Sequence, residues 1–119
     1  MNLWDLPRYL TIDVAASLEE RFMNSEELYA RFLRKLLNAP DFGALQANVA
    51  DENWPEALRL AHNLKGVCAN LGLNALSAAF AKLVTLLRGA SFTPEQARSQ
   101  LALIEPEWEK TLRCIEALD

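Results

Sequence analysis

The positions of helix-starting and helix-ending residues constrain the fold more than any other feature of this sequence. Between them, apolar residues recur at helical spacing, and no segment alternates with the period of two that indicates a β-strand. Gly72 and Gly89 lie where helices should end, in the capping position that tolerates a left-handed backbone. Thr93-Pro94-Glu95-Gln96 forms a capping box with proline at the first helical position. The sequence therefore predicts an all-α chain.

Capping residues and prolines set the expected helix bounds. With each first residue as the cap, the expected helices run from Asp13 to about Phe22, Ser25 to about Leu37, Asp41 to about Val49, Asn53 to Gly72, Asn74 to Arg88, and Thr93 onwards. Pro106 should kink or break the last one near Ile104-Glu105, because proline lacks a backbone donor. We expect an antiparallel four-helix bundle with short N-terminal helical additions, in which Leu3, Trp4 and Leu10 pack across one end.

The composition bounds the class of protein. With 119 residues, 51% hydrophobic and 24% charged, the chain has the size and make-up of one globular domain. No apolar run approaches the ~20 residues of a membrane-spanning helix, and the N-terminus lacks the basic start and apolar stretch of an export signal. A formal net charge of -4 argues against nucleic acid as a partner. We therefore expect a cytoplasmic protein that binds neither membrane nor nucleic acid.

The two cysteines indicate neither a metal site nor a disulfide framework. Cys68 and Cys114 lack Cys-x-x-Cys spacing, and the chain has only one histidine to join them. We interpret both as small core residues in a reducing compartment. The aromatic residues at helical spacing are interpreted as core in the same way: Phe22, Tyr29, Phe32, Phe42, Trp54, Phe80 and Trp108.

The single histidine, His62, falls on the exposed side of its predicted helix. At about 100° per residue, the apolar positions gather into one stripe: Ala57, Leu60, Leu64, Val67, Cys68 and Leu71. His62 lies roughly opposite the centre of that stripe, and its neighbours at i+4 and i+7 are Gly66 and Ala69. A glycine inside a helix costs roughly 0.5 to 1 kcal/mol relative to alanine. Its presence here predicts that something needs room beside the imidazole.

The charges near His62 favour an anion. Lys65 at i+3 can place its ammonium beside the ring, and Arg59 at i-3 adds a second positive charge. An ordinary solvated imidazole is mostly neutral at pH 7, so one ring nitrogen keeps a lone pair and can act as a nucleophile. These residues indicate covalent attachment of a negatively charged group. The competing interpretation is a surface histidine that lies near a lysine by chance.

Two short motifs resemble a known family. His62-Asn63-Leu64-Lys65-Gly66 and Asn70-Leu71-Gly72 are similar to the active helix of the histidine phosphotransfer (HPt) domain of bacterial phosphorelays. The likeness extends over roughly residues 11 to 88, and it implies a single HPt-like domain over 1–119, with a family-like core at about 11–118 and an N-terminal extension at 1–10.

The resemblance also implies a function for individual residues. His62 would accept a phosphoryl group from an aspartyl phosphate on a receiver domain and pass it to the aspartate of another receiver. Lys65 would hold the phosphoryl oxygens, and Gly66 would leave room for the phosphoryl group and the partner. The chain departs from the family pattern at Val84, where relatives often carry glutamate, and at Leu73, where a small residue is common. Both departures bear on which receiver is recognised and leave the chemistry of the histidine untouched.

The expected partners are response-regulator receiver domains, which can belong to a hybrid sensor kinase. The chain has no glycine-rich phosphate loop, so we expect no binding of ATP and no autokinase activity. No cofactor is expected, because magnesium would be held by the receiver. The predicted docking residues are Leu58, Arg59 and Ala69, on the exposed part of the histidine helix; Leu58 can equally belong to the edge of the core.

Two other functions compete with the carrier. The first is a non-catalytic helical-bundle interaction module, in which His62 is only a contact residue. The second is a hydrolase or metal enzyme, which a single histidine without a second ligand or an oriented acid makes a weak candidate. We expect a monomer, since a carrier must present one histidine to two partners in turn. The sequence is compatible with a free-standing protein and with a domain of a larger kinase, and the absence of a linker-like tail favours the former.

Overall fold

The computed structural model describes residues 1–119, and its regular secondary structure is entirely helical. The elements in chain order are the 3-10 helix η1 (Leu3–Arg8), α1 (Val14–Arg21), α2 (Glu26–Lys35), the 3-10 helix η2 (Leu36–Asn38), α3 (Asp41–Ala50), α4 (Trp54–Asn70), α5 (Asn74–Arg88) and α6 (Pro94–Glu116). Ile12 and Leu73 form an isolated antiparallel bridge, and there is no strand. The prediction of an all-α fold is confirmed.

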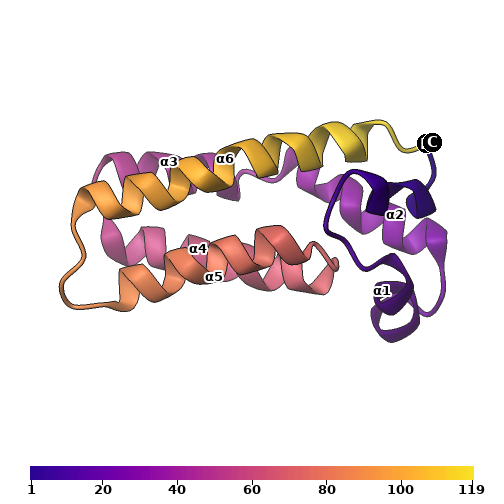
Figure 1. Cartoon of the computed structure of the whole chain (residues 1–119), viewed down its shortest axis with the longest axis horizontal. Coiled ribbons are helices and arrows are strands. Elements are labelled where there is room, and N and C mark those ends of the chain that lie inside the picture. The colour runs from indigo at the N-terminus through magenta and orange to yellow at the C-terminus, as the bar shows by residue number, and fades with distance from the viewer.

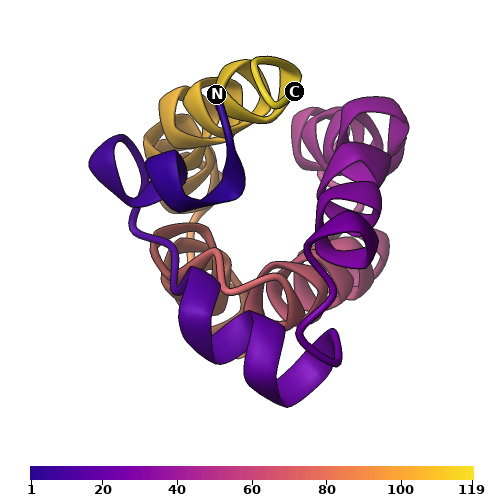
Figure 2. The same cartoon turned by 90° about the vertical axis from the view of Figure 1, so that its right-hand side faces the viewer.

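The helices form an elongated bundle of four rods. Its principal extents are 43, 24 and 22 Å. Viewed from the side, α4 and α5 run along one edge and α6 runs along the other, with α2 and α3 behind it (Figure 1). Viewed from the end, α2 and α3 make up one rod, and α4, α5 and α6 are the other three, while α1 crosses the end of the bundle (Figure 2). No helix combines the length and the apolar character needed to cross a bilayer.

One continuous apolar core fills the bundle. Phe42 stacks on Trp108 with ring centroids 4.6 Å apart, and Phe80 meets both rings edge-on at 6.1 Å. The two departures from the family pattern, Val84 and Leu73, are each only 2% exposed and belong to this core. Burial of such a side chain contributes about 1.5 to 3 kcal/mol to stability, so both residues help to hold the core together.

Several predicted helix ends are present as expected. Asp13 and Ser25 accept hydrogen bonds from the backbone N–H groups of Ala16 (2.9 Å) and Leu28 (3.1 Å). Both bonds of the capping box at the start of α6 form, at 2.8 and 3.2 Å. Gly72, two residues beyond the end of α4, has a φ of +72°, the left-handed conformation predicted for it.

Other predicted caps are wrong. Asp41 and Asn74 are the first residues of their helices, while Pro40 and Leu73 occupy the capping positions. The Asn74 N–H instead donates to the Thr11 carbonyl at 3.0 Å, so a distant segment satisfies a donor at the start of α5. Asn53 does cap α4 by position, but its side chain makes no capping bond. Gly89 has an extended backbone, with φ -71° and ψ 151°.

The predicted break at Pro106 does not occur, and α6 runs without interruption (Figure 1). Pro106 has no N–H to donate to the backbone carbonyl of Ala102, four residues earlier. Ala102 is exposed, so water can hydrogen-bond to that carbonyl instead. Buried side chains on both sides of the proline, including Ile104 and Trp108, hold the two halves of the helix against the bundle.

The N-terminal segment packs as predicted except at Trp4. Leu3, Leu6 and Leu10 are buried, whereas Trp4 is 51% exposed. In a 3-10 helix the side chains three residues apart eclipse, so Leu3 and Leu6 share the inner face and Trp4 falls outside it.

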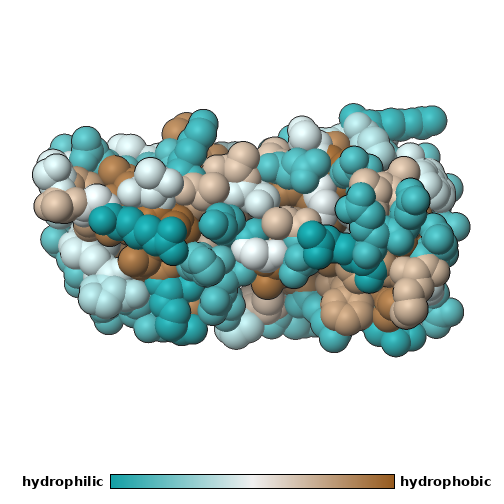
Figure 3. All heavy atoms as spheres, turned by 90° about the horizontal axis from the view of Figure 1, so that it is seen from below, coloured by the Kyte–Doolittle hydropathy of each residue, from teal (hydrophilic) through white to brown (hydrophobic).

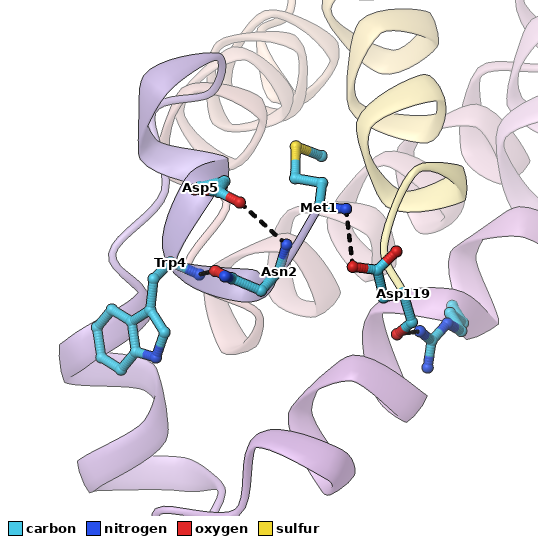
Figure 4. A network of polar contacts seen from close by, with 6 residues as sticks. Met1, Asn2, Trp4, Asp5 and Asp119 are labelled. Carbon is cyan, nitrogen blue, oxygen red and sulfur yellow. Dashed lines mark hydrogen bonds and ion pairs between the residues drawn. The ribbon is translucent and has the colours of Figure 1, made fainter.

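The two ends of the chain lie together (Figure 4). The Met1 amino group donates to the Asp119 carboxylate at 3.0 Å, and the Asp119 N–H donates to the Met1 carbonyl at 2.9 Å. Asn2 caps η1 by accepting from the Trp4 N–H at 2.9 Å. Arg34 of α2 donates to the Asp119 backbone oxygen at 2.6 Å, which ties the ends to the bundle.

Candidate functional site

Helix α4 positions His62 on its solvent side. The buried residues of α4 are Ala57, Leu60, Ala61, Leu64 and Cys68. His62 is exposed, and its ring forms no hydrogen bond or ion pair within the chain. The predicted stripe is wrong at Val67, which is 41% exposed, while Ala61 is fully buried in its place. Val67 lies at the edge of the stripe, where burial depends on whether a neighbouring helix covers it.

The glycine beside His62 is not required by the fold. A Cβ built at Gly66 would meet no heavy atom within 4 Å outside its own helix and chain neighbours. Alanine would therefore fit there and would favour the helix by about 0.5 to 1 kcal/mol. The packing of the fold therefore gives no reason for a glycine at this position.

Lys65 supplies the free positive charge near His62. It is half-buried, and its ammonium forms no ion pair. The backbone carbonyl of Lys65 accepts a hydrogen bond from the Ser77 hydroxyl of α5 at 3.3 Å. Residues three apart on a helix have Cβ atoms about 5 to 6 Å apart, so the ammonium can reach an anion held at the imidazole.

The charge of Arg59 is engaged elsewhere, which corrects the expectation of a second free cation at the site. Its Nε donates to both carboxylate oxygens of Glu56, at 2.9 and 3.1 Å. The hydrogen bond from Arg59 lowers the pKa of Glu56, and the same bond raises the pKa of Arg59.

Of the other predicted docking residues, Ala69 is exposed, and Leu58 is half-buried and packs against the core.

The end of α4 is anchored to the N-terminal helices. The Tyr29 hydroxyl of α2 donates to the Leu71 carbonyl at 2.5 Å. The Asp13 N–H donates to the Gly72 carbonyl at 3.1 Å. A Cβ at Gly72 would collide with the Ser17 hydroxyl and would approach the Asp13 carbonyl oxygen to 2.9 Å. These contacts fix the helix that carries His62 against α1 and α2.

In a comparison with protein families, the family model of the Hpt domain matches residues 17–118 of the chain. The chain belongs to the Hpt domain family. The resemblance found in the sequence is thereby confirmed. An Hpt domain is a phosphotransfer intermediate of a phosphorelay and not a kinase, and Hpt domains typically interact with receiver domains. No curated protein and no solved structure matches the chain.

This Hpt domain also carries a groove that sequence reasoning missed, which we name the α2–α4 groove. It encloses about 610 Å³ and is lined by Arg21, Phe22, Leu28, Phe32, Lys35, Leu36, Ala39, Val67, Asn70 and Leu71. Phe32 and Val67 were both predicted to be core, but they are 40% and 41% exposed. Figure 3 views the face formed by α1, α4 and α5, on which apolar patches are scattered among hydrophilic residues.

The burial of Cys68 agrees with its prediction as a core residue. Burial raises the pKa of its thiol to about 12, so the thiolate is scarce at neutral pH. Cys114 is half-buried, and both cysteines are free. No group of three or more His, Cys, Asp or Glu side chains in the Hpt domain could hold a metal ion.

Proposed function

We propose that this Hpt domain is a phosphocarrier in which His62 accepts a phosphoryl group from a receiver-domain aspartyl phosphate and passes it to the aspartate of another receiver. One observation carries the assignment to His62. Its imidazole is exposed and unpartnered, beside a glycine for which the fold has no need and a lysine whose charge is free. The family supplies the reaction class, phosphotransfer within a phosphorelay.

The transfer requires no group beyond the imidazole and the receiver. The unprotonated ring nitrogen attacks phosphorus, a nitrogen–phosphorus bond forms, and the bond from phosphorus to the carboxyl oxygen breaks with its electron pair leaving on the aspartate. The ring becomes positively charged as the carboxylate regains its negative charge, and loss of the remaining N–H proton to water neutralises the ring. The reverse sequence on a second receiver regenerates free His62.

Lys65 and Gly66 support this step in different ways. The Lys65 ammonium is placed to form charge-assisted hydrogen bonds to the phosphoryl oxygens, which become more negative as the bond to the aspartate breaks. Gly66 leaves space for the phosphoryl group and for the receiver surface that delivers it. Arg59, Leu58 and Ala69 would contact the receiver around this point, and Arg59 would do so with its charge already shared with Glu56.

The receiver would supply the remaining chemistry. Magnesium neutralises phosphoryl oxygens during such transfers. We propose that the ion is held by the receiver and that this chain acts as a monomer, exposing one histidine to two partners in turn.

The decisive experiment follows label from a phosphorylated receiver domain to the protein and on to a second, unphosphorylated receiver. Receivers encoded in the same genome form the panel. Wild type should take up and release label, whereas His62→Gln should do neither, and Asn63→Gln, the exposed neighbour on the same helix, should behave as wild type. Folding of each variant is checked by circular dichroism. Failure of folded wild type with every receiver, or normal transfer by His62→Gln, would overturn the proposal.

A further inference from the structure

We propose that Arg59 changes its partner when His62 is phosphorylated: it releases Glu56 and donates to the phosphoryl oxygens. This inference rests on the proposed function, because it describes how the proposed site responds to its own phosphorylation. It makes Arg59 a ligand of the phosphorylated state alone. Glu56 is then a positioning residue, which acts on the phosphoryl group through Arg59.

Arg59 lies between Glu56 and His62 on α4. Each of the two is three residues away from it, a spacing that places Cβ atoms about 5 to 6 Å apart. Side chains of a helix tilt toward its N-terminus, so the imidazole of His62 leans over the turn that carries Arg59. The guanidinium can therefore reach either neighbour by rotation of its own side chain, and the backbone need not move.

The existing pair can be broken at small cost. Arg59 donates from Nε to both carboxylate oxygens of Glu56, at 2.9 and 3.1 Å, yet its side chain is 57% exposed. Exposed ion pairs contribute little to stability, because water screens both charges. Glu56 also lies in the first turn of α4, where the helix dipole favours a carboxylate. Water and the helix terminus can therefore stabilise Glu56 once Arg59 leaves.

A phosphoryl group on His62 would be the stronger acceptor for Arg59. It carries about two negative charges and three acceptor oxygens, more than a carboxylate offers. The planar guanidinium matches phosphate in a bidentate geometry. The Asp41 carboxylate of α3 competes only weakly: the pKa of Arg59 is raised mainly by the hydrogen bond from Arg59 to Glu56 and least by Asp41.

The two cations that flank His62 therefore differ in availability. Lys65 forms no ion pair, so its ammonium is free whether or not His62 carries a phosphoryl group. Arg59 must first break its bonds to Glu56, which offsets part of the stabilisation that it gives to phosphohistidine. Because a carrier has to release the group to a second receiver, this offset favours onward transfer.

Substitutions at the pair test the proposal through the equilibrium of phosphoryl transfer from a receiver to His62. Arg59→Gln should lower the equilibrium constant about threefold, a factor typical of an exposed charge contact. Glu56→Gln should raise it about threefold, because Arg59 no longer has to leave a carboxylate. Glu27→Gln and Arg31→Gln are matched controls from an exposed ion pair of α2 and should leave it unchanged. Equal shifts in the control pair would show that overall charge is responsible and would overturn the proposal.

A double variant separates a change of partner from direct repulsion. If Glu56 acts through Arg59, Glu56→Gln should lose its effect in a protein that already carries Arg59→Gln. The same increase in both backgrounds would mean that the Glu56 carboxylate repels the phosphoryl group by itself. That result would overturn the proposal.

Nuclear magnetic resonance observes the change of partner directly. Phosphoramidate, a small phosphoryl donor, should phosphorylate wild type and shift the Arg59 Nε–H signal. The signal of Arg98, an exposed arginine that pairs with Glu52, should stay in place. An unmoved Arg59 signal in phosphorylated wild type would overturn the change of partner and leave the carrier function intact. Absence of phosphorylation in folded wild type, by phosphoramidate and by receivers, would overturn the carrier function and this inference with it.

Discussion

The Tyr29 hydroxyl donates a hydrogen bond of 2.5 Å to the Leu71 carbonyl, and this bond joins α2 to the end of the helix that carries His62. Tyr29 is fully buried and also stacks on Phe22, with centroids 4.7 Å apart. The same residues border the α2–α4 groove, since Phe22 and Leu71 line it. The contact therefore fixes the position of α2 relative to the end of α4.

Tyr29→Phe should lower the free energy of unfolding by about 1 to 2 kcal/mol, because it leaves the Leu71 carbonyl without its buried donor. Urea unfolding measures the effect. Tyr9→Phe removes an exposed hydroxyl and should leave stability unchanged. A Tyr29→Phe variant as stable as wild type would show that the bond contributes nothing to the fold.

Stability should also fall at alkaline pH because of Tyr29. Burial raises the pKa of its hydroxyl above the ordinary value of 10.0. The folded protein then holds the proton more tightly than the unfolded chain, so this contribution to stability is complete below about pH 10 and is lost as pH rises through the folded pKa. The difference in urea midpoint between wild type and Tyr29→Phe should shrink over that range. A constant difference would contradict the shift.

Gly66→Ala should separate stability from function. The fold has room for the methyl group, so the variant should gain about 0.5 to 1 kcal/mol of stability from helix propensity. Phosphoryl transfer from a receiver should nevertheless slow, because the methyl group occupies space meant for the partner. Thermal unfolding and label transfer, measured on the same sample, give both results. Unchanged transfer would remove Gly66 from the site.

Gly72→Ala provides the contrast in the same experiment. Its φ of +72° and the collision with Ser17 make a side chain unfavourable there, so stability should fall by about 1 kcal/mol or more. Alanine is thus expected to stabilise the fold at Gly66 and to destabilise it at Gly72.

Cys68 and Cys114 should react very differently with thiol reagents. Burial raises the pKa of the Cys68 thiol to about 12, which keeps it protonated at pH 8. A chromogenic disulfide reagent should label Cys114 first and Cys68 only on unfolding in denaturant. Equal labelling rates in the folded protein would contradict the burial of Cys68 in the core.

The sequence alone predicts those features that depend on neighbours within one helix. The outward position of His62 followed from the apolar stripe of α4, and the capping box of Thr93 followed from four adjacent residues. Val67 and Phe32 could not be placed, because they lie at the margins of their stripes, where exposure depends on how closely α2 approaches α4. The partner of the Asn74 backbone N–H could not be predicted either, because this N–H donates to the carbonyl of Thr11, which is far away in the sequence.

The pairing of Arg59 with Glu56 is a local feature that the spacing of the two residues does indicate. The two residues are three apart on an exposed helix face, a spacing that favours ion pairs. Because Glu56 already pairs with Arg59, Lys65 is the cation near His62 whose charge is free.

The most direct test of the carrier is to locate the phosphoryl group after exposure to a phosphorylated receiver. Tandem mass spectrometry under alkaline conditions, which preserve phosphohistidine, should find one phosphoryl group on the peptide that contains His62, and mild acid should remove it. A phosphoryl group on any other residue, or none while the receiver is discharged at the same rate by His62→Gln, would contradict the account.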